Sequence, residues 1–342
     1  MSTAHVAVLL TVAALLSPTA PAQAQSVGQV FRRVAPSVVV IRTKEKEVAA
    51  QGQVSSVAGV GSGVLISADG KVLTAAHVVQ TADEITVKFL SGEEIPARVM
   101  ASEPEADVSL LQLERPPPRP VVARLGDSDK VEVGDQVFIV GAPYGIGHTL
   151  TVGHISARHK PSTVYSGMSL AEFFQTDAAI NQGNSGGPMF SITGEVIGVV
   201  SHIISKSGGF EGLGFVVTIN MARRLVLERR SFWSGMSGQV LSGELAKVFN
   251  LPQPIGVLVQ RIAAGSPAAV IGLRPGTIPA TIEGKSFLVG GDIILQVQGI
   301  RIEEPSSYQR IQEALMRLRP GSQVGITVLR EGRLEGLSAP MP

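Results

Sequence analysis

Three short segments carry side chains that could together cleave an acyl bond. A histidine lies in Thr74–Val78 (TAAHV), an aspartate opens Asp107–Leu113 (DVSLLQL), and a serine is flanked by glycines in Gly183–Pro188 (GNSGGP). A serine hydroxyl is a useful nucleophile only when a base removes its proton. His77 is the candidate base, and Asp107 could hold the imidazole in the required tautomer. These residue types therefore predict a nucleophilic Ser185.

Each segment also has an ordinary structural interpretation. A glycine-rich turn can contain a serine without a chemical role, a single histidine among small residues is often a core residue, and an aspartate at a strand edge often faces solvent. The order His77, Asp107, Ser185 favours catalysis, because this triad is known in that chain order. The N–H groups of Gly183 and Ser185 could bind an oxyanion, and one such donor is worth roughly 10²–10³ in rate.

The elements that must position these residues are short strands. Between about residues 27 and 220, apolar runs are separated by Gly, Pro, Asn and Asp, which predicts a β-barrel or sandwich. The expected strands are 37–42, 63–67, 85–89, 108–113, 136–140 and 195–201. Proline excludes Arg115–Pro120 (RPPPRP) from a central strand or a helix interior. We interpret it as an extended connection between two halves, the alternative being a polyproline ligand for a partner.

A second β-rich unit follows a short helix. Helical spacing over Asn220–Arg230, with Asn220 as the N-cap, predicts an interdomain helix. The later pattern predicts strands at 257–261 and 293–297, a helix at 306–318 and a hairpin that turns at Glu331-Gly332. The segment 276–290 could form a further small hairpin.

Composition narrows the classes of protein. A chain of 342 residues predicts two domains, and 44% hydrophobic residues argue against disorder. A net charge of +1 argues against a nucleic-acid partner. The absence of cysteine excludes disulfides, a thiol nucleophile and Cys-ligated zinc. No group of His, Asp and Glu has ligand spacing, so we expect no metal and no cofactor.

The N-terminus has the pattern of an export signal. Val6–Leu16 is apolar but only 11 residues long, whereas a membrane-spanning helix needs about 20. Ser17-Pro18 and the small-x-small motif Ala22–Ala24 follow, which predicts a signal peptide over 1–24, cleaved after Ala24. A retained anchor is the alternative. We expect a periplasmic protein with no stable membrane span after cleavage.

The motifs resemble those of the HtrA/Deg family of trypsin-like serine proteases. In the first half, the resemblance lies in TAAHVV around His77, DVSLLQL, Thr176–Pro188 (TDAAINQGNSGGP), Gly61–Val64 and Gly212–Phe215. In the second half, Phe232–Met236 (FWSGM), Gly256–Val259 and Gly265–Ala269 are similar to the PDZ domain of that family. Gln182 stands where the family usually has Pro, and Ala142 stands where Asn is common.

The resemblance implies a mainly β chain: a chymotrypsin-like double β-barrel protease domain at 25–220, a linker helix at 221–232 and a PDZ domain at 233–338. It implies ATP-independent endoproteolysis of unfolded or misfolded exported proteins, and assembly as a homotrimer or a multiple of trimers. Ser234, Gly235 and Met236 would bind peptide C-termini. The alternatives are a PDZ domain that only stabilises assembly, and a holdase or scaffold whose protease site is inactive or rarely activated.

The resemblance also implies a substrate pocket at Ala179 and Leu213. In a chymotrypsin-type fold, the residue six positions before the nucleophile lies at the base of this pocket, and here that residue is Ala179. Because alanine offers no carboxylate to a basic side chain, we expect cleavage after small or medium aliphatic residues. Asp177 lies two positions earlier, and we expect it to be structural.

Overall fold

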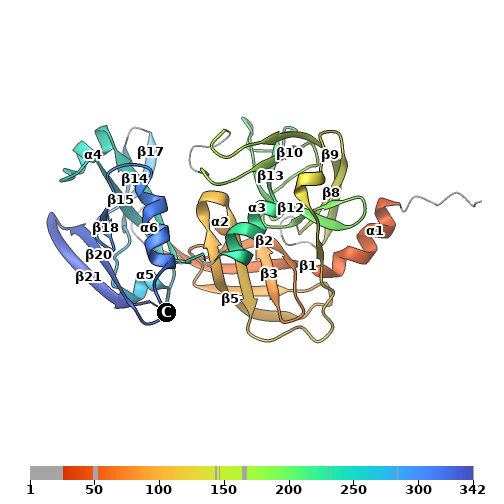
Figure 1. Cartoon of the computed structure of the whole chain (residues 1–342), viewed down its shortest axis with the longest axis horizontal. Helices are drawn as coiled ribbons and strands as arrows, with labels where there is room; N and C mark the ends of the chain where they lie inside the picture. Colours follow the sequence, from red (N-terminus) through yellow and green to blue (C-terminus); the bar gives the residue numbers. More distant parts are fainter. Residues whose placement is uncertain are drawn as a thin grey trace, which may run out of the picture.

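The computed structural model describes residues 26–48, 53–142, 145, 147–163, 168–229, 231–282 and 284–341. Within these ranges the chain forms two β-barrels that lie side by side and a third, smaller sheet domain at one end (Figure 1). The predicted mainly β fold is confirmed. The expected signal peptide at 1–24 lies outside the described residues, and no helix within them has the length and apolarity to cross a bilayer.

The first barrel is a closed ring of six antiparallel strands in the order β1-β2-β3-β6-β5-β4. Its core is aliphatic, and Ile41, Leu65 and Leu111 are fully buried in it. The strands are β1 (Val38–Val48), β2 (Val54–Leu65), β3 (Lys71–Thr74), β4 (Glu84–Lys88), β5 (Glu94–Glu103) and β6 (Val108–Leu113). The one-turn helix α2 (Ala76–Val79) follows β3, and the 3₁₀ turn η2 (Pro104–Ala106) precedes β6.

The second barrel closes through pairing of β11 with β12, and β7 adds to β12 in parallel. Its strands are β7 (Arg124–Leu125), β8 (Gln136–Gly141), β9 (Thr149–His159), β10 (Phe173–Thr176), β11 (Pro188–Ser191), β12 (Glu195–Ile203) and β13 (Gly214–Thr218). Aromatic rings fill its interior, with Phe138 stacked on Phe190 at 5.2 Å between ring centroids. The proline-rich segment 115–120 is irregular and connects the two barrels, as predicted.

A helix that the sequence analysis missed precedes the first barrel. α1 (Val27–Val34) begins with a capping box, in which Ser26 and Gln29 satisfy each other's backbone N–H groups. Val30 and Val34 of this helix are buried in a core that also contains residues of the second barrel. The 3₁₀ turns η1 (Ala35–Ser37) and η3 (Ser128–Lys130) are the other short helical elements here.

The predicted interdomain helix begins earlier and packs more deeply than expected. α3 (Ile219–Ala222) continues as the π-helical η5 (Arg223–Glu228), and the N-cap is Thr218 rather than Asn220. The prediction was wrong because the Asn220 side chain instead donates to Asp127 Oδ1 at 2.7 Å. Leu225 is buried in a core that contains residues of both barrels, so this helix packs on the barrels rather than standing free between domains.

The third domain is an antiparallel sheet in the order β14-β15-β18-β20-β21, with β19 paired to β18. Its strands are β14 (Met236–Ser242), β15 (Ile255–Ile262), β18 (Ile293–Val297), β19 (Ile300–Arg301), β20 (Gln323–Arg330) and β21 (Arg333–Pro340). A separate hairpin of β16 (Ile278–Ile282) and β17 (Lys285–Val289) occupies the segment expected to contain one. The helices are α4 (Glu244–Val248), α5 (Pro267–Val270) and α6 (Ser307–Met316).

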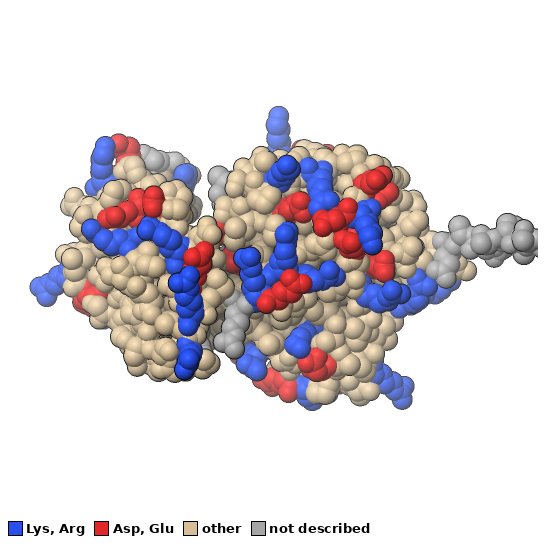
Figure 2. Space-filling view, in the orientation of Figure 1, with Lys and Arg blue, Asp and Glu red and all other residues tan. Residues whose placement is uncertain are grey.

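Polar contacts join the third domain to the first barrel. The Trp233 indole packs on the barrel core and donates Nε1–H to the carbonyl of Gln80 at 3.1 Å. From α6, Tyr308 and Gln312 donate to the buried carboxylate of Glu103, at 3.2 Å and 2.6 Å. Figure 2 shows acidic and basic side chains interspersed over the visible face of the molecule.

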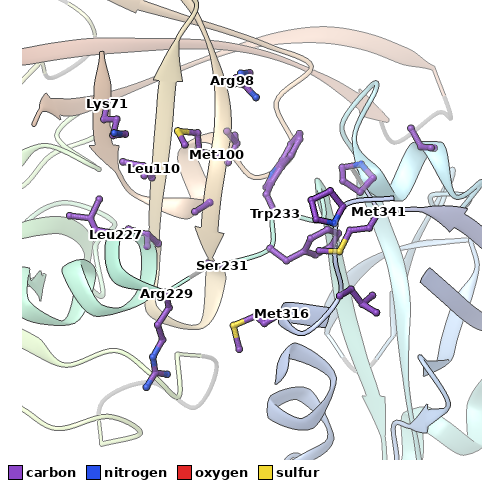
Figure 3. Close-up of a pocket in the computed structure, with 18 of the residues that line it drawn as sticks. Lys71, Arg98, Met100, Leu110, Leu227, Arg229, Ser231, Trp233, Met316 and Met341 are labelled. Atoms are coloured by element: carbon purple, nitrogen blue, oxygen red, sulfur yellow. The ribbon is translucent and has the colours of Figure 1, made fainter. Parts of the chain in front are cut away.

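A cavity of about 860 Å³ lies between the first barrel and the third domain. Leu110 and Met100 line it from the barrel, Met316 and Met341 line it from the third domain, and Trp233 lies between them (Figure 3). The linker at Ser231 runs along its wall, so the two domains meet through a limited set of contacts rather than a continuous apolar core.

Candidate active site

His77 and Asp107 are brought together by two neighbouring elements of the first barrel. His77 lies on α2, and its Nδ1 is 2.9 Å from Asp107 Oδ1 and 3.0 Å from Oδ2. The backbone N–H of His77 also donates to Asp107 Oδ1, at 3.0 Å. The imidazole is half exposed while the carboxylate is buried. This arrangement fixes the proton on Nδ1 and leaves Nε2 to act as a base.

Two backbone irregularities aim side chains at this pair. Asp107 follows the turn η2 in the left-handed conformation, with φ 51° and ψ 44°, which aspartate tolerates better than most residues. On β12, pairing with β13 shifts register between Val200 and His202, so Ser201 is the extra residue of a β-bulge. The Ser201 hydroxyl donates to Asp107 Oδ2. β-bulges commonly redirect side chains next to active sites.

Burial and pairing have opposite effects on the pKa values of the pair. Burial alone would lower the pKa of His77, but the charge and hydrogen bond of Asp107 outweigh it, so the pKa of His77 is raised. Burial alone would raise the pKa of Asp107, but the charge of His77 and the hydrogen bonds of His77 and Ser201 outweigh it, so that pKa is lowered. Asp107 is therefore ionised over the whole working range of a histidine base.

The Ser185 loop comes from the second barrel and is tied to the first barrel by Ser62. The N–H of Ser62 donates to the Ser185 carbonyl at 2.8 Å. The Ser62 hydroxyl donates to the Gly183 carbonyl at 2.6 Å and accepts from the Ala142 N–H at 2.9 Å. Ser62 is fully buried on β2. Because the Ala142 contact uses the backbone N–H, the departure from asparagine at this position leaves it intact.

The glycines around Ser185 are required by backbone conformation and close packing. Gly183 has φ 98° and Gly186 has φ 81°, values that are costly for residues with a Cβ. A Cβ on Gly186 would lie 2.1 Å from Thr74 Oγ1, so this turn packs directly on the segment before His77. Among described residues, the N–H groups of Gly183 and Ser185 donate to no protein acceptor. Both are free to bind a substrate oxygen.

The Ser185 hydroxyl itself donates to the carbonyl of Ser201 at 3.3 Å. Within the described ranges, no hydrogen bond joins it to His77. In ligand-free enzymes, the bond between nucleophile and base is often long or poorly aligned and tightens only when substrate binds. Ser201 thus contacts two of the three candidate residues, through its side chain and its carbonyl.

The residues expected to form a substrate pocket come from two loops: Ala179 from the loop between β10 and β11, which also carries Ser185, and Leu213 from the end of the loop between β12 and β13. Ala179 is half-buried and accepts from Thr151 at its carbonyl, while Leu213 is exposed. Ile180 and Phe210 pack together with the core beneath them. The Asp177 carboxylate accepts from the backbone N–H of His154 at 2.6 Å. It therefore binds the β9 backbone.

The segment expected to bind peptide C-termini lies at the start of an edge strand. β14 pairs with β15 on one side only among the described strands, which leaves an edge open to an added strand. Gly235 has φ 69° and is packed tightly against Ser266. The Gln80 side chain, three residues after His77, donates to the Met236 carbonyl at 3.0 Å and to Ser234 Oγ at 3.4 Å. The expected peptide site thus contacts the helix that carries His77.

Sequence reasoning missed several residues around the site. Ser62, Gln80, Glu103, Ser201 and His202 are common residue types with no local motif of their own, and their contacts join segments far apart in the chain. For Ser62, the one indication of a role in the site was its position within Gly61–Val64, a stretch similar to the family pattern. Across the described ranges, no three His, Asp or Glu side chains could hold a metal ion together.

Comparisons with known proteins agree with this architecture. A family model described as a trypsin-like peptidase domain matches residues 61–199, and one described as a PDZ domain matches residues 217–340. A probable periplasmic serine endoprotease, DegP-like, from Halomonas elongata is 37% identical over 291 residues, 83% of this chain and 56% of the relative. The periplasmic pH-dependent serine endoprotease DegQ of Escherichia coli is 34% identical over 80% of this chain and 57% of its own length.

The chain thus spans about half the length of the curated relatives it matches. A solved structure, the HtrA-type protease AlgW with tripeptide, is 32% identical and superimposes with a TM-score of 0.53, covering 93% of this chain and 98% of that one. A second solved structure, the HtrA-type protease AlgW with decapeptide, is 30% identical to this chain and superimposes on it with a TM-score of 0.54. The chain belongs to the HtrA-type serine protease family, in which a trypsin-like peptidase domain is followed by a PDZ domain.

Proposed function

We propose that the protein is a serine endopeptidase with His77, Asp107 and Ser185 as its catalytic triad. The observation that carries this proposal is the buried Asp107 carboxylate, which accepts from the Nδ1 and backbone N–H of His77 and from Ser201. A surface carboxylate has no need of three donors, whereas a triad aspartate uses them to orient and stabilise the imidazole.

The reaction follows from this geometry. Ser185 Oγ attacks the peptide carbonyl while His77 Nε2 accepts its proton. The N–H groups of Gly183 and Ser185 stabilise the oxyanion, and Ser62 holds the loop that presents them. Protonated His77 then gives its proton to the leaving amine, and water hydrolyses the acyl-enzyme by the same proton transfers in reverse.

Specificity for small or medium aliphatic side chains before the cleaved bond is supported by the pocket residues. Ala179 and Leu213 offer no charge, and the neighbouring Ile180 and Phe210 pack into the apolar core of the second barrel. One oxygen of Asp177 accepts from the backbone N–H of His154, and the other lies 4.0 Å from the His154 ring. A basic side chain would lose its hydration in this pocket without gaining an ion pair.

The substrates we propose are unfolded or misfolded exported proteins, and the proposed location is the periplasm after removal of residues 1–24. The names of the relatives, periplasmic serine endoproteases, support this location. Assembly as a homotrimer or a multiple of trimers is part of the same proposal. The domain boundaries that we propose are 25–220 for the protease, 221–232 for the linker and 233–338 for the PDZ domain.

We further propose that peptide C-termini bind along the free edge of β14, with Ser234, Gly235 and Met236 holding the carboxylate, and that binding raises activity. Solved relatives that contain a tripeptide and a decapeptide support peptide binding. Gln80 already donates to the Met236 carbonyl at the start of this edge. A peptide that competes for this position would release Gln80 and with it a restraint on α2, which carries His77.

The deciding experiment measures cleavage of an unfolded casein-like substrate by residues 25–342 and by the Ser185→Ala variant, with and without C-terminal peptides. Cleavage by the first protein alone supports the proposal. Equal cleavage by both proteins, each purified free of other proteases, would refute the role of Ser185. Absence of cleavage in all conditions would instead favour a binding protein whose site is inactive.

A further inference from the structure

The β-bulge that presents Ser201 also places a histidine beside the triad. Because Ser201 is the extra residue, His202 resumes pairing with Phe215 on β13. The Nδ1 of His202 lies 3.0 Å from Ser201 Oγ. This is the same hydroxyl that donates to Asp107, so two hydrogen bonds through Ser201 link the His202 ring to the carboxylate.

The number of protons determines the direction of these hydrogen bonds. A serine hydroxyl has one hydrogen, and an ionised carboxylate can only accept. Since Asp107 is ionised, the hydrogen of Ser201 is committed to it, and Ser201 Oγ must accept from His202. The geometry therefore assigns the hydrogen of His202 to Nδ1. A continuous series results, in which His202 donates to Ser201, and both Ser201 and His77 donate to Asp107.

Two phenyl rings hold the His202 imidazole in this orientation. Phe215 of β13 stacks on it at 5.1 Å with an interplanar angle of 10°, and Phe173 of β10 meets it edge-on at 5.3 Å and 88°. Both contacting side chains are uncharged. The charge of Asp107 raises the pKa of the His202 ring and that of His77 lowers it. Burial outweighs the attraction of Asp107, so the pKa of His202 is lowered and the ring is neutral near neutral pH.

We propose that His202 is a positioning residue for the hydrolysis assigned above: it holds the Ser201 hydroxyl on Asp107 and thereby sets the basicity of His77. The predicted effect of His202 on kcat rests on the proposed function. Its predicted effect on the pKa of His77 does not. With the donor removed, the Ser201 hydroxyl can turn away from Asp107. The carboxylate then keeps more negative charge for His77, which raises the pKa of the imidazole and loosens its orientation.

The test compares His202→Phe, His202→Asn and His159→Phe. Phenylalanine keeps a ring between Phe173 and Phe215 but has no donor, whereas the amide of asparagine can donate from nearly the position of Nδ1. His159 is the matched control, because it also contacts Phe215, at 5.9 Å, but its Nε2 hydrogen-bonds to Gln175 instead of the triad.

The first measurement is the pKa of His77 by ¹⁵N NMR titration in a Ser185→Ala background, which requires no catalytic activity. We expect His202→Phe to raise it by about half a unit, the scale of one hydrogen bond, and the other two variants to leave it near the parent value. The second measurement is kinetics with Ser185 intact. We expect His202→Phe to lower kcat about five-fold at unchanged KM, and His202→Asn to recover most of the loss.

The outcomes separate the two proposals. An unchanged His77 pKa in His202→Phe, or an equal shift in His202→Asn, overturns the inference, since a role in packing alone would not depend on the donor. A wild-type protein without hydrolytic activity refutes the proposed function, while the NMR titration still decides whether His202 acts through Ser201. If His159→Phe shifted the pKa of His77 as much as His202→Phe does, the effect would come from the aromatic cluster, and the inference would also be overturned.

Discussion

Glu103 offers a direct way to perturb the contact between the PDZ domain and the protease. Its carboxylate is only 3% exposed and accepts from Tyr308 and Gln312 of α6. Burial nevertheless outweighs these hydrogen bonds, so the pKa of Glu103 is raised. We therefore expect Glu103→Ala to weaken docking, and the isosteric Glu103→Gln to preserve or strengthen it by removing the buried charge.

The magnitude follows from the two opposing effects. Hydrogen bonds to a charged group contribute about 1.5–3 kcal/mol each, so Glu103→Ala forfeits about 3–6 kcal/mol. Removing the carboxylate also removes its desolvation penalty, which is several kcal/mol for a buried ion. The difference is about 1–2 kcal/mol, which corresponds to a 5–30-fold fall in the ratio of docked to undocked molecules.

Trp233 provides the assay, because it is the one tryptophan of the chain and its indole packs on the barrel across the domain boundary. Undocking should shift its emission to longer wavelength. The exposed Glu84→Gln, which disrupts the ion pair with Lys44, is the control. Burial raises the pKa of Glu103 in the folded protein, so the folded protein binds this proton more tightly than the unfolded chain does. The destabilisation caused by the buried Glu103 charge should therefore diminish as the pH falls through the window just above the ordinary glutamate pKa, and the free energy of unfolding of Glu103→Gln should lack this dependence.

Emission from Glu103→Ala that matches wild type would refute this account of the contact. So would a Glu103→Gln protein that undocks more than wild type, because the carboxylate charge would then stabilise the interface.

Four further predictions concern the site and the core. Asp107→Asn should reduce kcat by about 10³–10⁴ with little change in KM, since the amide favours the wrong tautomer of His77. Initial rates of cleavage over a range of substrate concentrations will test this. Ser62→Ala should lower kcat by about ten-fold, because Gly183 loses the hydroxyl that orients its peptide; rescue by Thr would indicate that the hydroxyl is responsible. The acid limb of the pH profile of kcat/KM should have its midpoint above about pH 6.5, since His77 must be neutral to act and its pKa is raised. A midpoint at or below that pH contradicts the raised pKa. Phe138→Ala should reduce the free energy of unfolding by about 3–5 kcal/mol, measured by urea denaturation, and a loss below 1 kcal/mol would contradict its place in the core.

The sequence contained enough local information to predict most of the strands and the residues with distinctive motifs. β6 and β18 have the predicted bounds, and the Glu331-Gly332 turn of the last hairpin has positive φ at both residues. The helix over 219–228 was misjudged, because whether Thr218 or Asn220 caps it depends on the distant partners Glu172 and Asp127.

The supporting residues of the site could not be found in the same way. Ser62, Ser201 and His202 acquire their roles through contacts between barrels or through a β-bulge, and neither leaves a pattern in the local sequence. Likewise, the contact of Glu103 with α6 joins residues more than 200 positions apart. Hydrophobic periodicity predicts which residues face a core, but not which polar side chains meet across an interface.

The division of the site between two barrels has a consequence for when the chain can react. His77 and Asp107 belong to the first barrel, and Ser185 and Ser201 arrive only with the second, where Ser62 anchors the incoming loop. A chain that has folded only its first half has a base but no nucleophile, and one whose barrels have separated has lost its oxyanion geometry. Hydrolysis by the proposed triad therefore requires the completed fold, because a half-made or partly unfolded molecule lacks the assembled site.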